Sequence, residues 1–180
     1  MWSGVLDTPS DQKPPHNIVL GGFMGTGKST VGRITAQRLG WTYIDSDARI
    51  ASREKLTIPQ IFAQHGEAYF RRLERELAPE LAALSQVVIA TGGGMLVEPA
   101  NLDAFVQRGL VICLTASPEA IQARIGRDEA GRPLLRGGWR ALLESRRVAY
   151  DRIPHQIDTT GKPLEQVVNE VLALWQFEST

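Results

Sequence analysis

Short apolar segments alternate with segments of helical periodicity along most of this chain. The apolar segments are residues 17–22, 41–45, 86–91, 110–116 and 155–159. Nearly continuous apolar character is typical of parallel strands that are covered on both faces. The segments with an apolar residue every three or four positions are 67–84, 98–108, 117–125 and 163–176. Alternating strands and helices predict an α/β fold with a parallel sheet.

Three stretches depart from this alternation. Pro79 lies within the helical segment 67–84 and predicts a kink or an interruption there. The segment at residues 126–138, GRDEAGRPLLRGG, is rich in glycine and charge. This composition fits two alternatives equally well: a mobile loop with a function, or a surface loop without one. Residues 1–16 are polar and contain prolines, so we expect a flexible tail before one domain at 17–180.

The segment GFMGTGKS, residues 22–29, matches the phosphate-loop pattern G-x-x-x-x-G-K-[ST]. It follows a predicted strand and precedes a predicted helix, which is the context that the pattern requires. Lys28 is expected to reach the β- and γ-phosphates of a nucleotide, and the Ser29 hydroxyl is expected to bind Mg²⁺. The residues predicted to surround the nucleotide here are Gly25, Thr26, Gly27, Lys28, Ser29 and Thr30.

Two aspartates end the second predicted strand. Asp45 and Asp47 are two residues apart, so in an extended chain they point the same way. The strand at 86–91 ends without an acid, which makes Asp45 the best candidate for the metal-side carboxylate. Asp47 would then orient or deprotonate a hydroxyl group of an acceptor. The alternative is that these acids serve the next helix, for which Ser46 and Asp47 are suitable N-caps.

Three consecutive glycines, Gly92–Gly94, follow the strand at 86–91. They present backbone N–H groups without side chains, so a small polar acceptor could lie against them; a tight turn with positive φ is the alternative. Arginines could hold a carboxylate of that acceptor. Arg71 is one candidate, although pairing with Glu74 or Glu76 at the surface is the commoner fate of such a residue. Arg146 and Arg147 are further candidates on a later helix.

Composition narrows the class of protein. The chain has 20 Lys plus Arg and 20 Asp plus Glu, which argues against nucleic-acid binding through a basic field. The lone cysteine, Cys113, lies in an apolar run and is expected to be buried and reduced, as in the cytoplasm. The three histidines match no zinc spacing, and no segment has the length of a membrane-spanning helix or the pattern of a signal peptide.

Five motifs in order resemble those of the shikimate kinases. They are GFMGTGKSTVGR, YIDSD, FRRLE, TGGG and RPLL, and the resemblance runs from about residue 17 to 176. It implies a three-layer, five-stranded parallel sheet flanked by helices, with a mobile lid at about 126–138. Two departures concern the lid side: the segment from Arg132 to Arg146 is short, and RRVAY stands where the family tends to read Arg-x-Pro-Leu-Tyr. The choice between Arg146 and Arg147 therefore stays open.

The resemblance also implies an activity and its residues. The γ-phosphate of ATP would pass to the 3-hydroxyl of shikimate, a step towards chorismate and the aromatic amino acids. Lys28, Asp47 and the lid residue Arg132 would carry the chemistry, with Mg²⁺ on Ser29 and, through water, on Asp45. Arg124 and Pro163 would enclose adenine, and Phe62, Phe70 and Glu74 would shape the acceptor pocket. Shikimate would contact Asp47, Arg71, Gly92, Gly93, Gly94 and Arg146.

The partners expected are therefore the small molecules shikimate and ATP, and we expect a monomer that binds neither nucleic acid nor membrane. Three other functions use a phosphate loop on such a fold. A kinase for gluconate or another polyol would also use Asp47 and arginines, although the glycine run argues against it. A nucleoside monophosphate kinase would phosphorylate AMP or CMP. A nucleotide sensor would bind ATP without an acceptor, against which the presence of Asp47, Arg71 and Arg132 speaks.

Overall fold

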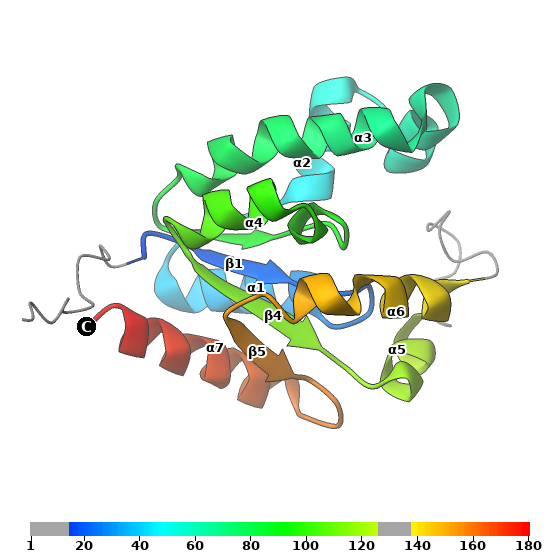
Figure 1. The fold of residues 1–180 in the computed structure, drawn as a ribbon. Helices are drawn as coiled ribbons and strands as arrows, with labels where there is room; N and C mark the ends of the chain where they lie inside the picture. Colours follow the sequence, from blue (N-terminus) through cyan, green and yellow to red (C-terminus); the bar gives the residue numbers. More distant parts are fainter. Residues whose placement is uncertain (1–14, 126–137) are drawn as a thin grey trace, which may run out of the picture.

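A five-stranded parallel sheet runs through the centre of the computed structural model, which describes residues 15–125 and 138–180 (Figure 1). In chain order the strands are β1 (Ile18–Gly21), β2 (Thr42–Asp45), β3 (Val87–Ala90), β4 (Leu110–Thr115) and β5 (His155–Asp158). They lie in the order β2-β3-β1-β4-β5 and every pair is parallel. The predicted α/β fold and the five strands are thus confirmed.

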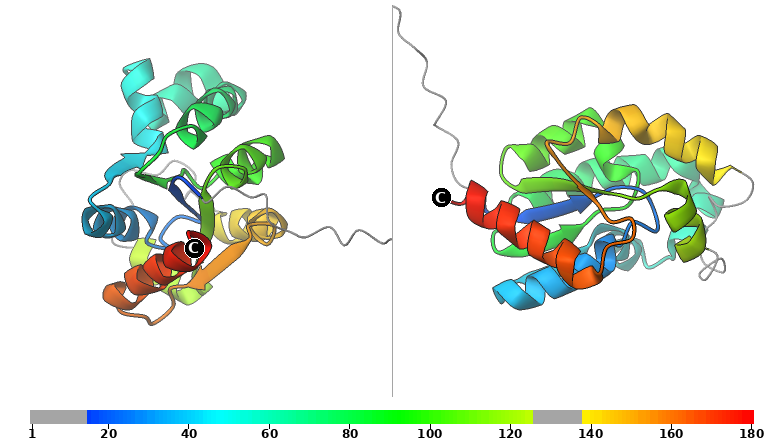
Figure 2. Two further views of the ribbon diagram at one scale, coloured as in Figure 1. Left: turned by 90° about the vertical axis from the view of Figure 1, so that its left-hand side faces the viewer. Right: turned by 90° about the horizontal axis from the view of Figure 1, so that it is seen from below.

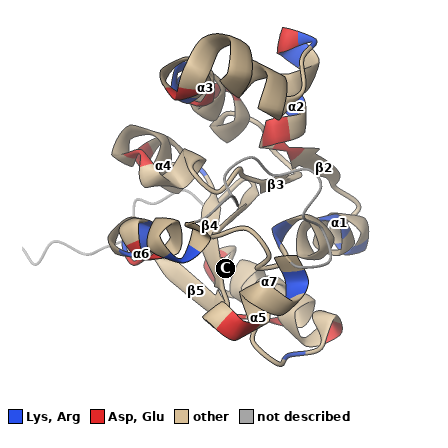
Figure 3. Ribbon diagram, turned by 90° about the vertical axis from the view of Figure 1, so that its right-hand side faces the viewer, with Lys and Arg blue, Asp and Glu red and all other residues tan. Residues whose placement is uncertain are grey.

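Helices cover both faces of the sheet. They are α1 (Lys28–Leu39), α2 (Ser46–Glu54), α3 (Ile58–Ala82), α4 (Pro99–Val106), α5 (Pro118–Ile125), α6 (Trp139–Tyr150) and α7 (Leu164–Glu178), with a 3-10 turn η1 (Met95–Val97) before α4. Helices α3, α4 and α6 lie on one side of the sheet, and α1 and α7 lie on the other (Figures 2 and 3). The result is the expected three-layer arrangement.

The central strand shows why its sequence is apolar at every position. Val19 of β1 packs into the core beneath α3 and α4, whereas its neighbours Ile18 and Leu20 pack into the core beneath α1 and α7. All three side chains are fully buried. Alternate side chains of a strand point to opposite faces, so a strand with helices on both faces needs apolar residues throughout.

The position of β1 in the sheet places the phosphate loop. β1 pairs with β3 on one side and β4 on the other. The chain leaves β1 into α1 on one face, but it leaves β3 towards α4 on the opposite face (Figure 3). Loops that diverge in this way open a crevice at the carboxyl ends of the strands, where ligands of such folds bind.

Pro79 does not interrupt the helical segment as expected. Helix α3 continues past it to Ala82, and the residue with non-helical backbone is Gly66 (φ 81°, ψ 175°). Pro79 has no backbone N–H and therefore removes one helical hydrogen bond. Because it lies in the last turn of α3, only a few helical residues follow it. Gly66 instead separates the first turns of α3 from the part that begins at Glu67, which is where the sequence predicted a helix to start.

Most of the predicted tail and lid lies outside the described residues. Residues 1–14 of the tail and 126–137 of the lid, with Arg132, are not described. His16 is already tied to the domain, because its N–H donates to the carbonyl of Arg108 and its carbonyl accepts from Gln86, both at 2.8 Å. Within the described ranges, no helix combines the length and apolar character needed to cross a membrane.

Candidate active site

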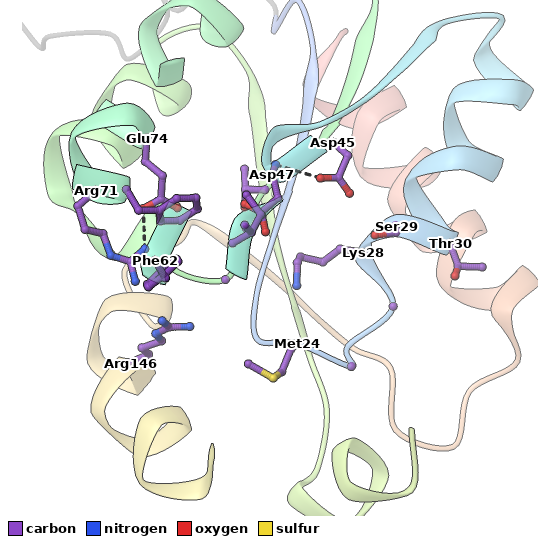
Figure 4. A pocket seen from close by; sticks show the side chains of 18 of the residues that line it. Met24, Lys28, Ser29, Thr30, Asp45, Asp47, Phe62, Arg71, Glu74 and Arg146 are labelled. Carbon is purple, nitrogen blue, oxygen red and sulfur yellow. Dashed lines mark hydrogen bonds and ion pairs between the residues drawn. The ribbon is translucent and has the colours of Figure 1, made fainter. Parts of the chain in front are cut away.

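A pocket of about 590 Å³ lies at the carboxyl end of the sheet. Its wall includes every predicted site residue within the described ranges except Thr26 and Pro163. Figure 4 shows two groups of side chains in it, with Asp47 between them. Lys28, Ser29 and Asp45 lie on one side, and Arg71, Glu74 and Arg146 lie on the other. The pocket therefore has two sides, called below the phosphate side and the acceptor side after the ligands that the motifs predict for them.

On the phosphate side, no side chain of the described residues caps the first turn of α1. Its N-cap residue, Gly27 (φ 100°), provides no side chain, and the turn contains no acidic residue. The leading N–H groups of a helix have no intrahelical acceptor and carry a positive dipole end, so this arrangement suits an anion. Lys28 adds a cation here, and its Nζ donates to the carbonyl of Phe23 at 2.8 Å.

Of the described residues, Thr26 and Pro163 are the two predicted for the nucleotide site that do not line this pocket. The Thr26 side chain is buried and its hydroxyl donates to the carbonyl of Phe23 at 2.8 Å, so it shapes the loop from inside. Pro163 is exposed at the N-cap of α7 and is not part of the pocket wall. Its predicted partner Arg124 does line the pocket, where its guanidinium donates to the carbonyl of Gly25 at 3.0 Å.

Asp45 is the N-cap of α2, a role for which the sequence offered Ser46 and Asp47 as the alternative to their use in the site. Its Oδ1 accepts from the N–H groups of Asp47 at 3.0 Å and Ala48 at 3.1 Å. β2 ends at Asp45 and Asp47 lies in the first turn of α2, so the argument from an extended chain was wrong. Both side chains nevertheless line the pocket.

The second carboxylate oxygen of Asp45 faces a tyrosine. The Tyr43 hydroxyl lies 3.4 Å from Oδ2 of Asp45. Burial raises the pKa of Tyr43; a hydrogen bond with Ser29 opposes that shift, and the Asp45 charge adds to it. Ser29, Tyr43 and Asp45 thus place three oxygen atoms together at the edge of the phosphate loop.

Three side chains on the acceptor side of the pocket meet at Gly92–Gly94, which we call the glycine corner. A Cβ on Gly92 would collide with the Asp47 carboxylate, and one on Gly94 would collide with the Arg71 guanidinium. At Gly93 a Cβ would lie 3.0 Å from Nη1 of Arg146. None of the three has the positive φ that the alternative of a tight turn requires. Close approach of three charged side chains, one to each glycine, accounts for this run.

Hydrogen bonds fix the glycine run from outside the pocket. The N–H of Gly92 donates to the Ser46 hydroxyl at 2.8 Å, and the Tyr150 hydroxyl donates to the carbonyl of Gly93 at 2.6 Å. Burial raises the pKa of Tyr150 to about 12, so this hydroxyl keeps its proton near neutral pH. The run is held by α2 and α6, whose side chains also enter the pocket.

Arg71 is both an ion-pair partner and a pocket residue. Its Nη1 lies 2.6 Å from Glu74 and its Nη2 lies 2.9 Å from Glu67. Glu74 is only 1% exposed, and its second oxygen accepts no hydrogen bond from the described residues. Burial raises the pKa of Glu74 to about 7 against the opposing charge of Arg71. The predicted surface pair is therefore a largely buried one that faces the acceptor side.

The structure distinguishes the two arginines of α6. Arg146 is buried and lines the pocket, and its guanidinium lies 5.9 Å from the centre of the Phe23 ring. Arg147 is largely exposed and pairs with Glu144 at 3.7 Å. Phe23 belongs to the phosphate loop and also packs on Trp139 of α6, with ring centres 6.3 Å apart. This contact joins the phosphate loop to the acceptor side.

Comparison with known proteins identifies the family. The family model "Shikimate kinase" matches residues 24–176. The chain belongs to the shikimate kinase family. It is 44% identical over 175 residues to a shikimate kinase of Geobacter sulfurreducens, covering 94% of this chain and 93% of that protein.

Solved structures agree with this assignment. A shikimate kinase from Acinetobacter baumannii in complex with shikimate has a TM-score of 0.84 at 35% identity, over 92% of this chain and 95% of that one. A gluconokinase from Sinorhizobium meliloti has a TM-score of 0.59 at 18% identity, over 93% and 95% of the two chains. The second likeness shows a shared fold alone.

Several residues that build the pocket of this shikimate kinase family member were not predicted. Met24 and Ile58 form part of its wall, and Ser46 and Tyr150 hold the glycine run. Tyr150 lies one helical turn after Arg146, which is a signal that they share a face. Met24 lies within the phosphate-loop motif, at one of the positions where that motif allows any residue. Ile58 and Ser46 have no local signal for the roles they take here. Cys113 is buried as predicted; burial raises the pKa of its thiol to about 12, which makes it a poor nucleophile.

Proposed function

We propose that this protein transfers the γ-phosphate of ATP to the 3-hydroxyl of shikimate, giving shikimate 3-phosphate and ADP. The reaction would serve the route to chorismate and the aromatic amino acids. Membership of the family supports ATP as the phosphate donor. A related kinase of known structure was solved with shikimate, which supports the acceptor.

The observation that carries the proposal is the glycine corner. Asp47, Arg146 and Arg71 each lie against one glycine of Gly92–Gly94. A cyclic acid with several hydroxyl groups presents a carboxylate and hydroxyls at different edges, and these three side chains offer cations for the first and a carboxylate for the second. Arginine binds a carboxylate with two parallel hydrogen bonds, which fixes the ring as well as its charge.

Asp47 and Lys28 are the residues proposed to assist the chemistry within the described chain. The 3-hydroxyl oxygen would form a bond to the γ-phosphorus, its proton would pass to the Asp47 carboxylate, and the bond from phosphorus to the ADP oxygen would break. Lys28 would neutralise charge that develops on the phosphoryl oxygens. Arg132, which is not described, is proposed to add a second cation from the lid.

The donors at the edge of the phosphate loop fit Mg²⁺. Ser29 and Asp45 supply hard oxygen ligands, and no group of three or more His, Cys, Asp or Glu gathers among the described residues. Magnesium fits such a sparse site, because it keeps several waters and is held by one or two protein oxygens plus phosphates. When bound, it would neutralise the β- and γ-phosphate oxygens. Ser29 would ligate it directly, and Asp45 would act through water.

We also propose that the protein is a cytoplasmic monomer. Its exposed large apolar side chains are spread over several segments of the described chain; they are Leu84, Val106, Val148, Leu164 and Phe177. Isolated exposed residues of this kind are ordinary and do not indicate an interface. Sedimentation equilibrium is expected to give the chain mass of 19.8 kDa; a concentration-independent mass of twice that value would refute the monomer.

The test of the function is ADP release coupled to a spectroscopic assay. Mg-ATP would be offered alone and with shikimate, gluconate or AMP, and the product would be identified by its phosphorus spectrum. Release that depends on shikimate alone is the expected result. Release with gluconate or AMP would move the assignment to another acceptor, and nucleotide binding without release for any acceptor would favour a sensor.

A further inference from the structure

Thr159 lies where the phosphate loop, β4 and β5 meet. It follows the last residue of β5, Asp158, and its side chain is only 3% exposed. Its backbone N–H donates to the carbonyl of Thr115 at 2.9 Å, which continues the sheet by one residue. No sequence motif marked this residue, and it does not form part of the pocket wall.

The Thr159 hydroxyl sits among three polar groups from distant parts of the chain. It lies 3.2 Å from the carbonyl oxygen of Thr26 and 3.0 Å from that of Thr115, and it accepts from Nη1 of Arg124 at 2.9 Å. A hydroxyl has one proton to donate and lone pairs with which to accept. This one can therefore receive Arg124 while it donates to one of the two carbonyls.

Arg124 is held at two points by the same residue. Its Nη1 donates to the Thr159 hydroxyl and its Nη2 donates to the Thr159 carbonyl, both at 2.9 Å. Nη1 also donates to the carbonyl of Gly25 at 3.0 Å. These bonds fix the plane of the guanidinium against the phosphate loop. Arg124 lines the pocket, so its orientation is presented to the ligand.

The phosphate loop is held by the same contact. Gly25 and Thr26 bear the carbonyls that Arg124 and Thr159 approach. A loop that binds phosphates through its own N–H groups must keep its carbonyls turned away from the anion. Donors placed behind those carbonyls, as here, favour that orientation. A phosphate loop that is already ordered in this way loses less conformational entropy when the nucleotide binds.

We propose that Thr159 is a positioning residue of the nucleotide site, which locks Arg124 to the phosphate loop so that both meet one nucleotide in a fixed arrangement. The proposal rests on the proposed function only in that the pocket binds ATP. Thr159 acts through Arg124 and through the carbonyl of Thr26 and touches no substrate itself.

The decisive variant is Thr159→Val, which keeps the shape of the side chain and removes the hydroxyl. Because a hydrogen bond from a charged donor is lost, the Kd for ADP and the KM for ATP are expected to rise about tenfold. The KM for shikimate is expected to stay within a factor of about two, since Thr159 contacts none of the acceptor residues. Thr159→Ser, which restores the hydroxyl, is expected to return both constants towards wild type.

A matched control separates positioning from loss of a buried hydroxyl. Thr35 of α1 is also fully buried, and its hydroxyl has no hydrogen-bond partner among the described residues. Thr35→Val is expected to leave ADP binding unchanged. Thermal midpoints of all variants would be measured beside the binding constants. If Thr159→Val does not fold, Thr159→Cys, which keeps a weakly hydrogen-bonding group of similar size, is interpreted by the same criteria.

A double-mutant cycle with Arg124→Ala tests the route of the effect. If Thr159 works through Arg124, Thr159→Val weakens ADP binding less in the Arg124→Ala background than in the wild type. Equal losses in the two backgrounds, or parallel rises in the constants for ATP and shikimate, would overturn the proposal. Failure of the wild type to bind ADP would instead refute nucleotide binding itself, so the two failures are distinguishable.

Discussion

Asp47 is the residue whose surroundings best define a chemical role. It lies between the cationic phosphate side and the acceptor side of the pocket, against Gly92 (Figure 4). Its position in the first turn of α2 follows from the capping of that helix by Asp45, which fixes the backbone N–H of Asp47. A carboxylate held in this way can take a proton from a hydroxyl that reacts nearby.

Replacement of Asp47 by asparagine keeps the shape of the side chain and removes its basicity. We expect kcat to fall at least about 100-fold, because a positioned general base contributes roughly 10²–10⁴ in rate. ADP affinity should be nearly unchanged. Asp103→Asn, the same change at an exposed position of α4, serves as the control. Steady-state kinetics and calorimetry provide the test, and near-normal turnover of Asp47→Asn would contradict the role as base.

Glu74 is expected to make the free energy of unfolding depend on pH. Burial raises its pKa from 4.5 to about 7, so between these values the folded protein keeps a proton that the unfolded chain has released. The contribution of Glu74 to the free energy of unfolding therefore falls as pH rises from about 4.5 to 7, by roughly 3 kcal/mol if the shift is complete. At pH values well above 7 both states are ionised and the contribution is constant.

Glu74→Gln removes the titrating carboxyl, so comparison of the variant with the wild type isolates its contribution to the free energy of unfolding. The free energy of unfolding of the wild type, minus that of the variant, is expected to decrease between pH 5 and 7 and to level off above pH 7. Urea unfolding of both proteins at matched pH values measures the difference. A difference that stays constant between pH 5 and 7 would mean that the pairing with Arg71 outweighs burial and that the carboxylate is already ionised in the folded protein.

At the scale of elements, the turn after β3 decides the shape of the acceptor side. Helices α2, α3 and α6 each direct one side chain at it: Asp47, Arg71 and Arg146. The turn itself is held by Ser46 and Tyr150 from α2 and α6. Glycine is required here for space rather than for backbone conformation, so a methyl group added at Gly92 or Gly94 would displace the Asp47 or Arg71 side chain.

Gly94→Ala tests this requirement directly. The new Cβ would occupy the place of the Arg71 guanidinium, so we expect the KM for shikimate to rise about tenfold or more while that for ATP changes little. Gly138→Ala is a suitable control, because its Cβ meets no described residue within 4 Å and its φ of −168° is available to any residue. Equal effects of the two variants would show that the site tolerates a side chain at Gly94.

These elements also show what could be predicted from the sequence. The strands and the phosphate loop were predictable, because burial on both faces and a phosphate-binding turn leave local patterns. The choice of Arg146 over Arg147 was not, since neighbours on a helix differ only in the face they present, and packing against Phe23 decides it. Thr159 was missed because its hydroxyl contact with Thr26 joins residues 133 positions apart.

At the scale of the whole molecule, the pocket exists only when distant elements are assembled. Its wall extends from Met24 in the phosphate loop to Arg146 in α6, and it takes residues from α1 on one face of the sheet and from α3 and α6 on the other. The contact of Phe23 with Trp139 and Arg146 fastens the phosphate loop to the acceptor helix. The unfolded chain has no such site, so each ligand should stabilise the folded state by mass action.

Ligand-dependent thermal unfolding therefore tests the two sides of the pocket within one molecule. At 100 times its Kd a ligand stabilises by about 2.7 kcal/mol, which for a chain of this size raises Tm by roughly 5–10 °C. ADP and shikimate are each expected to produce such a shift in the wild type. Arg71→Ala should abolish the shift with shikimate and keep that with ADP, because Arg71 lies on the acceptor side only. Loss of both shifts together would mean that Arg71 supports the whole fold rather than one half of the pocket.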